Sequence, residues 1–155
     1  MEIPDLSLVE VPHLSPDFWR TVVLRQRELR DPLGLTLSIA EVLREGPPQR
    51  HFALLAPAEI LGCAIALPSG GDHVKIRQVA IASSHAGRGL GRFLMDGVEE
   101  ILAREGRFRK ISLHARVVVL GFYERLGYAA VGGTFEEIGI PHILMEKALT
   151  PRVTR

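Results

Sequence analysis

The sequence predicts an α/β protein of the α+β kind, with helices flanking one mixed, mostly antiparallel central sheet. Three observations carry this prediction. Apolar runs at 52–56 and 60–67 are separated by a short turn that contains proline, which indicates a β-hairpin. The run 75–82 predicts a strand, and a glycine-rich loop then leads into the amphipathic helix 89–105. Because that helix connects strand 75–82 to strand 111–115, these two strands are predicted to run parallel.

The elements before the hairpin are marked by capping and breaking residues. Residues 6–11 predict a first strand. Ser15 is a good N-cap and Pro16 suits a first helical turn, so a helix is predicted from there to Arg30, where a proline soon follows. A second helix is predicted over 37–44, ahead of a glycine and two prolines.

The elements after strand 111–115 complete the same sheet. A short helix is predicted over 117–126, although the three valines at its start lower its helix propensity. Strands are predicted over 128–132 and 140–147. The order is therefore βααβββαβαββ, without repeats or linkers, and a single domain is predicted over residues 1–155.

Composition and charge exclude several function classes. Of the 155 residues, 46% are hydrophobic and 24% are charged, which are ordinary values for a globular domain. Nineteen basic against 18 acidic residues give a net charge of +1, so neither a nucleic acid nor a membrane is expected as a partner. The sequence shows no signal-peptide pattern and no apolar run of about 18 residues, which predicts a cytoplasmic protein. The lone Cys63 lies in an apolar run and is expected to be a buried structural thiol rather than a nucleophile.

The glycine-rich loop after strand 75–82 is the strongest functional signal. Gly87, Gly89 and Gly91 leave room for a ligand, and the start of a helix offers backbone N–H groups that lack intrahelical partners. These groups and the helix dipole attract a phosphate. The loop lacks the Lys-Ser or Lys-Thr of a P-loop, and its third glycine comes one residue early for a dinucleotide fingerprint. A turn that only packs the helix against the sheet is the structural alternative.

Three segments together resemble one enzyme family. Residues 86–91, AGRGLG, are similar to an acyl-CoA loop of the pattern Gln/Arg-x-x-Gly-x-Gly/Ala, and residues 121–128, GFYERLGY, resemble an FYEKxGF segment. Both are motifs of the GCN5-related N-acetyltransferases (GNAT). The segment 135–145, with its Gly-Ile-Pro-His sequence, resembles the C-terminal motif of a bacterial subgroup of that family. The resemblance covers roughly residues 54–149 and implies the GNAT fold, in which the parallel strand pair splays apart.

Three residues depart from the family pattern. Ala86 stands where Gln or Arg is usual in the loop, so no side-chain contact with the donor is expected there. Arg116 takes the place of an Asn or Gln that often holds the pantetheine arm, and Val119 replaces a small alanine. None of these changes removes a backbone amide, so we expect donor recognition to rest mainly on the backbone.

The resemblance implies acetyl-CoA as the acyl donor. In the family, pantetheine pairs with a strand backbone that corresponds to Val79 and Ile81, as an added strand would. The pyrophosphate is expected on the N–H groups of the loop, where Arg88 and Arg92 either add charge or are solvated surface residues. The expected cofactor-binding residues are Val79, Ala80, Ile81, Gly87, Arg88, Gly89, Leu90, Gly91 and Arg92. No metal is expected, because the six histidines show no HExxH or similar ligand spacing.

Acetyl transfer to an amine requires that protons be moved. An alkyl amine with a pKa of ~10.4 is about 3.4 units too basic to attack at pH 7, a cost of roughly 4.6 kcal/mol. By resemblance, Tyr123 is the general acid that protonates the departing sulfur, and its structural alternative is a packing aromatic. Glu137 and His142 flank the turn between the last two strands and are candidates for the general base or for acceptor binding. The alternative for this pair is an exposed glutamate and a histidine at a strand end.

The sequence therefore predicts an N-acetyltransferase that acts on a primary amine of an unidentified small molecule or peptide. The alternative is a non-catalytic acyl-CoA-binding sensor. The first predicted helix carries Arg20, Arg25, Arg27 and Arg30, which indicate a solvated basic face or, less directly, a wall for an anionic acceptor. Edge strands of the sheet are compatible with a homodimer.

Overall fold

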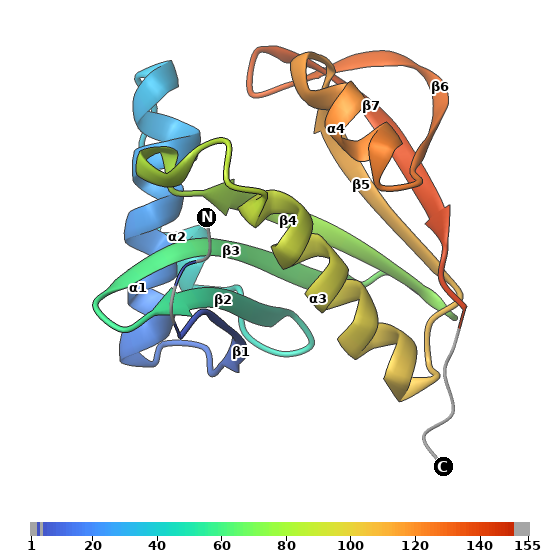
Figure 1. Cartoon of the computed structure of the whole chain (residues 1–155). Coiled ribbons are helices and arrows are strands. Elements are labelled where there is room, and N and C mark those ends of the chain that lie inside the picture. Colours follow the sequence, from blue (N-terminus) through green and yellow to red (C-terminus); the bar gives the residue numbers. More distant parts are fainter. Residues whose placement is uncertain (1–2, 4, 151–155) are drawn as a thin grey trace. The chain divides into compact units, whose positions relative to one another are not determined.

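The computed structural model describes residue 3 and residues 5–150 (Figure 1). The chain forms two compact units, Met1–Leu67 with Gln78–Val98 and Pro68–Arg77 with Glu99–Arg155. Strand β4 (His73–Ile81) and helix α3 (Leu90–Glu105) each contribute to both units. A single domain over the whole chain stays a prediction.

The strands of the first unit confirm the predicted hairpin. Strand β1 (Ser7–Val11) pairs antiparallel with β2 (Arg50–Ala56), which pairs antiparallel with β3 (Glu59–Pro68), and the three lie side by side in Figure 1. The end of β4 follows β3 in this order. Gly62 of β3 keeps this approach close, because a Cβ there would lie 2.9 Å from Ile81 Cδ1.

The first helix begins at the predicted cap. Helix α1 (Pro16–Arg25) has Ser15 as its N-cap, whose Oγ accepts a hydrogen bond of 3.2 Å from Phe18 N. The predicted helix to residue 30 continues past Arg25 as a π-helical turn, η1 (Gln26–Arg30), and a 3₁₀ turn, η2 (Asp31–Leu33). Helix α2 (Ile39–Leu43), capped by Ser38, is shorter than the predicted 37–44.

Helices α1 and α3 cover opposite faces of the first strands. Side chains alternate between the two faces of a strand. Val9 and Val11 of β1 belong to the core cluster of α1, whereas Leu8, between them, lies against α3, where a Cβ on Gly97 would be 2.5 Å from Leu8 Cδ2. The core on the α1 side consists of Val11, Phe18, Val22, Leu37, Val42 and Ala53, with Val9, Leu55 and Ile60 packed against it.

The second unit contains the parallel strand pair that the connecting helix predicted. Strand β5 (Lys110–Arg116) pairs parallel with β4 from His73–Lys110 to Ile76–Leu113. Strand β7 (Ile140–Ala148) runs antiparallel between β5 and β6 (Ala129–Glu137), so the last strand of the chain is inserted between two earlier ones. The fold is thus a mixed sheet, mostly antiparallel with one parallel pair, flanked by helices, as predicted.

Strand β6 is longer than the sequence indicated. It was predicted over 128–132 but extends to Glu137, because its pairing with β7 resumes at Phe135 after an irregularity that begins at Val131. Gly132 within this irregularity has a φ of +74°, a conformation that glycine adopts without steric cost. The predicted strand therefore stopped at a bulge that lies inside the strand.

A polar triad around the buried Glu99 connects elements of the second unit. Helix α4 (Leu120–Arg125), preceded by the 3₁₀ turn η4 (Val117–Val119), lies just before β6 in the chain. Tyr128 Oη donates to Glu99 Oε2 at 2.9 Å, and Lys147 Nζ donates to Glu99 Oε1 at 2.7 Å and to the Leu126 carbonyl at 2.6 Å. Glu99 of α3 thereby holds both β7 and the start of β6.

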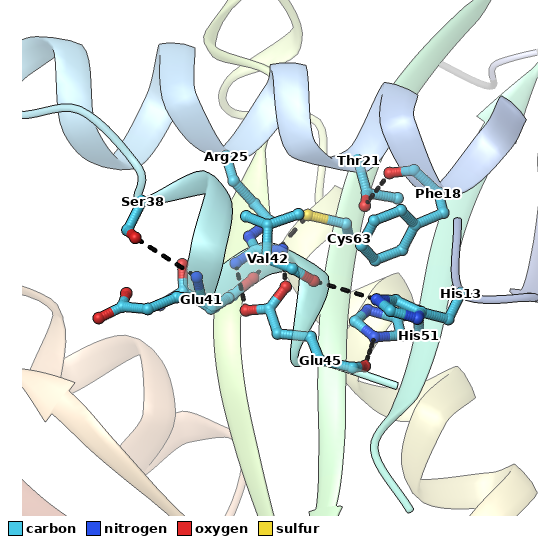
Figure 2. A network of polar contacts seen from close by, with 11 residues as sticks. His13, Phe18, Thr21, Arg25, Ser38, Glu41, Val42, Glu45, His51 and Cys63 are labelled. Carbon is cyan, nitrogen blue, oxygen red and sulfur yellow. Dashed lines mark hydrogen bonds and ion pairs between the residues drawn. The ribbon is translucent and has the colours of Figure 1, made fainter. Parts of the chain in front are cut away.

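One arginine of the first helix is buried rather than solvated, which corrects the expectation of a uniform basic face. Arg25 is 1% exposed and forms a bidentate pair with Glu45, at 2.8 Å and 2.7 Å (Figure 2). Arg20 and Arg27 keep surface partners, Asp17 and Glu28. Amphipathic periodicity failed here because the buried charge is matched by a residue 20 positions away, which no local pattern reveals.

Two histidines and the cysteine surround this ion pair. His51 Nε2 donates to the Glu45 carbonyl at 2.6 Å, and the His13 ring stacks on His51 with centroids 5.9 Å apart. Cys63 is buried, as predicted, and its Sγ donates to the Gln78 carbonyl at 3.8 Å (Figure 2). Burial raises the pKa of the Cys63 thiol to about 12, which keeps it protonated and unreactive at neutral pH.

Glu45→Gln is expected to lower the free energy of unfolding by about 3–5 kcal/mol, because it leaves the Arg25 guanidinium charged and unpaired inside the protein. Urea denaturation measures this loss. Asp17→Asn is the matched control, since it breaks the exposed pair with Arg20 on the same helix and should change stability by less than ~1 kcal/mol. Equal effects of the two substitutions would contradict the prediction.

Stability is expected to fall as the pH drops below about 6.5, the pKa of an unfolded-state histidine. Burial lowers the pKa of His51, so the unfolded state binds this proton at a higher pH than the folded state does. The stabilisation is complete above about 6.5 and is lost as the pH falls through the folded-state pKa. Urea denaturation between pH 5 and 8 should show a flatter profile for His51→Gln; an unchanged slope would refute the assignment.

Candidate functional site

The glycine loop of the first unit has the geometry of an anion site. After the 3₁₀ turn η3 (Ser83–His85), Gly87 and Gly89 have φ values of +79° and +75°, and a Cβ on either would meet no atom within 4 Å. Helix α3 begins at Leu90, so the N–H groups of its first turn lack intrahelical acceptors. The loop is exposed from residue 86 to residue 89. Open space and unpaired donors fit the phosphate that the sequence indicated.

The side chains of the predicted loop residues contribute less than the backbone. Arg88 is exposed, and Arg92 is exposed with its Nε 3.6 Å from Asp96 Oδ2 one helical turn away. The Leu90 side chain is buried, so this residue offers only its backbone N–H to a ligand. Ala86, which departs from the family pattern, is exposed and adds no polar side-chain group.

The end of strand β4 carries the three remaining predicted binding residues and one that was missed. Ala80 is buried, whereas Val79 and Ile81 are half-buried. Gln78 has a φ of +52°, a left-handed conformation that is unusual inside a strand. Its Oε1 and the Nε of Arg25 are buried without a hydrogen-bond partner among the described residues. No sequence signal marks Gln78, because glutamine has no preference for this conformation.

Tyr123 of helix α4, in the second unit, is a buried phenol. Its side chain is 8% exposed and packs edge-on against Phe122 and Tyr128, with ring centroids 5.0 Å and 5.8 Å away. Burial raises the pKa of Tyr123 to about 12, although the nearby charge of Arg116 opposes the shift. The hydroxyl has no hydrogen-bond partner within the described part of the chain. The phenol therefore keeps its proton at neutral pH and has a donor to offer.

The structure brings Glu137, His142 and His114 together. Glu137 ends β6 and His142 lies on β7, across a two-residue turn. Glu137 Oε1 lies 2.9 Å from His114 Nδ1, and Glu137 Oε2 lies 3.6 Å from His142 Nε2. Phe135 packs between the imidazoles, edge-on to His114 and stacked on His142. The result is one carboxylate flanked by two imidazole rings.

The hydrogen bonds of His142 define which of its nitrogens is available. Its Nδ1 lies 2.7 Å from the Ile140 carbonyl oxygen, which can only accept, so Nδ1 carries the hydrogen. In the neutral ring, Nε2 is then a bare lone pair beside the Glu137 carboxylate. An Nε2 that gained a proton would become a donor toward Glu137 Oε2. His142 is thus arranged as a proton acceptor with a carboxylate next to the accepting atom.

The charge state of Glu137 depends on its basic neighbours. Burial raises the pKa of its carboxyl, but the hydrogen bond from His114 and the charges of His114, His142 and Lys75 together lower it. Lys75 Nζ lies 3.4 Å from His114 Nδ1, and burial lowers the pKa of this lysine. Since His114 Nδ1 cannot both donate to Glu137 and accept from Lys75, we assign its hydrogen to the shorter contact with the carboxylate.

His114 and Lys75 were missed as site residues in the sequence. They lie on neighbouring parallel strands, in which His114 follows Leu113, the partner of Ile76. Glu137 lies on β6, which is next to β7, and β7 is next to the strand β5 that carries His114. Strand order decides these contacts, and the sequence pattern does not give strand order.

The described residues contain neither a metal site nor a membrane-spanning helix. Residue 3 and residues 5–150 contain no group of three or more His, Cys, Asp or Glu side chains placed to hold a metal ion. Within the same residues, no helix has the length and apolar character needed to span a bilayer.

Comparison with known proteins places the chain in a family. The model of the acetyltransferase (GNAT) domain matches residues 38–149. YyaT of Bacillus subtilis is 34% identical over 84 residues, 54% of this chain and 56% of that protein, and the chain spans about half the length of the curated relatives it matches. The chain belongs to the GNAT acetyltransferases.

Solved structures agree on the fold. An acyl-CoA N-acyltransferase from Pseudomonas aeruginosa gives a TM-score of 0.79 at 23% identity, covering 93% of this chain and all (100%) of that one. An aminoglycoside 6'-N-acetyltransferase complexed with coenzyme A gives a TM-score of 0.77 at 22% identity, covering 94% of this chain and 98% of that one. The architecture is the GNAT acyl-CoA N-acyltransferase fold. The subgroup with the Gly-Ile-Pro-His motif stays a prediction.

His114→Leu is expected to raise the pKa of the Glu137 carboxyl, because it removes the hydrogen bond and the nearby positive charge and leaves burial as the largest influence. Carboxyl-carbon NMR titration measures the shift. His73→Leu serves as the control, since His73 bonds to Ser112 and should leave the Glu137 titration unchanged. A Glu137 pKa that does not move in His114→Leu would refute this account.

Proposed function

We propose that the protein is an acetyl-CoA-dependent N-acetyltransferase that acts on a primary amine of a small molecule or peptide. One observation carries the proposal: the exposed loop at the start of α3, with Gly87 and Gly89 at positive φ, in a chain that belongs to the GNAT family. Such a loop suits a pyrophosphate, and acetyl-CoA supplies both that group and the acetyl thioester.

The proposed donor-binding residues act mainly through their backbone. N–H groups from Gly87 to Arg92 bind phosphate oxygens, and the guanidinium groups of Arg88 and Arg92 add positive charge from the surface. The backbone of residues 79–81 offers strand-type hydrogen bonds to the pantetheine amides. The side chains of Val79 and Ile81 are apolar and half-buried, so any hydrogen bond from these two residues to a ligand must come from their backbone. This supports the role.

The proposed acceptor side consists of Glu137 and His142. As the acetyl group moves from sulfur to nitrogen, the amine must lose a proton and the sulfur must gain one. His142 Nε2 takes the amine proton, and the Glu137 carboxylate beside it stabilises the imidazolium that forms. The lowered pKa of Glu137 supports this assignment, because the carboxylate then stays charged at neutral pH.

Tyr123 is the proposed donor to the sulfur. A thiol has a reference pKa of about 8.5, so a phenol at about 12 is the weaker acid by about 3.5 units, or roughly 4.8 kcal/mol. Full proton transfer to a free thiolate is therefore uphill. We assign Tyr123 a hydrogen bond from Oη that stabilises negative charge as it develops on sulfur, with the proton supplied at the end from solvent.

The function is tested by two measurements on the purified protein. Calorimetry should detect binding of CoA, and a thiol reagent should detect CoA release when acetyl-CoA is incubated with a panel of primary amines. Binding without release for every amine would favour the alternative, an acyl-CoA-binding sensor. If neither CoA nor acetyl-CoA binds, both functions are wrong.

Tyr123→Phe is expected to lower kcat by about 10²-fold or more, with little change in the Kd of CoA, because it removes a single hydrogen-bond donor from a buried ring. Steady-state kinetics and calorimetry measure the two quantities. Tyr128→Phe is the matched control, since the chain has two tyrosines and the Tyr128 hydroxyl bonds to Glu99. It should reduce stability but keep kcat. An unchanged kcat in Tyr123→Phe would remove the hydrogen bond from Tyr123 to the sulfur from the proposal.

A further inference from the structure

A carboxylate from the end of the first helix holds the start of the glycine loop. Glu28 Oε2 accepts a hydrogen bond from the backbone N–H of Ser83 at 3.0 Å and another from Ser83 Oγ at 3.2 Å. The Glu28 side chain is only 13% exposed. Two donors of one loop residue thus converge on one oxygen of a residue 55 positions earlier, which is the pattern of an anchor rather than of a chance surface contact.

The local structure of the helix end explains how Glu28 reaches the loop. Arg25, the last residue of α1, is fixed in the interior by its bidentate pair with Glu45 (Figure 2). The next five residues form the π-helical turn η1, in which Glu28 is the central residue. A π turn is wider than an α turn and is common at functional positions. The turn therefore carries Glu28 on a helix end that cannot shift freely, because Arg25 is held.

The loop gains from such an anchor because its glycine-rich part, from Ala86 to Gly89, is ordered only weakly by its own sequence. Ala86 adds no polar side-chain group, and Gly87 and Gly89 after it have wide conformational freedom when unbound. At its start, Ala82 N donates to the Leu61 carbonyl at 2.9 Å, and the η3 turn is closed by His85 N to the Ala82 carbonyl at 3.0 Å and Ala86 N to the Ser83 carbonyl at 3.1 Å. The contact with Glu28 adds a link from this turn to a distant part of the chain. A loop that binds an anion through backbone N–H groups binds more tightly when those groups are already held in place.

Charge balance favours a carboxylate at this position in spite of the proposed anionic ligand. Arg27 Nε lies 3.2 Å from the same Glu28 Oε2, so a guanidinium offsets the negative charge. The hydrogen bonds to Ser83 are charge-assisted and thus stronger than those to a neutral amide oxygen.

We propose that Glu28 is a positioning residue for the phosphate-binding loop: it fixes Ser83 and so preorganises the N–H groups of Gly87 to Arg92 for the phosphates of the acyl donor. This inference rests on the proposed function. According to this inference, the π-helical turn η1 contributes to donor affinity through Glu28, although Glu28 itself does not touch the donor.

The experiment compares CoA binding with binding of pantetheine, which lacks the phosphates. Calorimetry on Glu28→Gln and Glu28→Ala should show a Kd for CoA raised by about tenfold in the alanine variant and by less in the glutamine variant, which keeps an acceptor oxygen. The Kd for pantetheine should stay unchanged. Asp17→Asn, which removes a carboxylate from the same helix without touching the loop, should bind CoA as the unmodified protein does.

A double-mutant cycle separates positioning from general destabilisation. Ser83→Ala removes one of the two donors, and the combined Glu28→Ala, Ser83→Ala variant should bind CoA no more weakly than Glu28→Ala alone, because the two residues act through one contact. Hydrogen exchange of residues 83–90 without ligand should be faster in Glu28→Gln, at a melting temperature close to that of the unmodified protein.

Each outcome decides a different question. If the unmodified protein does not bind CoA, the proposed function is wrong and this inference falls with it. If the unmodified protein binds CoA and both Glu28 variants bind CoA as tightly as it does, the inference alone is overturned. Equal losses for CoA and pantetheine also overturn it, because they would show a general effect on the fold rather than one on the phosphate loop.

Discussion

The buried ion pair between Arg25 and Glu45 is the constraint on which the first unit depends. Removing two charges from water is costly, and a low-dielectric interior accepts them only with close geometry and additional hydrogen bonds. The pair meets this condition with two contacts of 2.7–2.8 Å, and His51 adds a hydrogen bond to the Glu45 backbone. Once formed, it fixes where α1 ends, and thereby where the π turn with Glu28 begins. The packing of α1 and the position of the glycine loop are thus connected through the Arg25–Glu45 salt bridge.

The second unit uses strand order to reach a comparable result. Because β7 is inserted between β5 and β6, a carboxylate at the end of β6 meets a histidine of β5 and a histidine of β7. Each charge in this cluster has an opposite or polar neighbour, so the exposed Glu137 carboxylate stays ionised although partial desolvation opposes its charge. The hydrogen bonds of Glu99 hold Tyr128 and Lys147, and neither Glu137 nor His142 takes part in them.

Most of the fold could be predicted from the sequence, because local signals govern it. The Ser15 cap, the hairpin and the parallel pair required by a connecting helix were all confirmed, and so was the buried Cys63. The failures share a physical cause: the burial of Arg25, the bulge in β6 and the contact of His114 with Glu137 depend on partners distant in sequence. Residue patterns report the neighbours along a helix or strand, and they carry no information on which buried charge meets which.

The departure at Ala86 has a physical interpretation in this setting. A loop whose first position carries Gln or Arg gains affinity from a side chain, which is flexible and loses entropy when it binds. A loop with alanine there relies mainly on backbone donors, whose affinity for the ligand depends on how well they are held before the ligand arrives. The Glu28 contact acts on that second quantity, since it fixes Ser83 three residues before Ala86. An anchor outside the loop can therefore take over the contribution of a contact inside it, so a substitution at a binding motif need not remove the binding function of the loop.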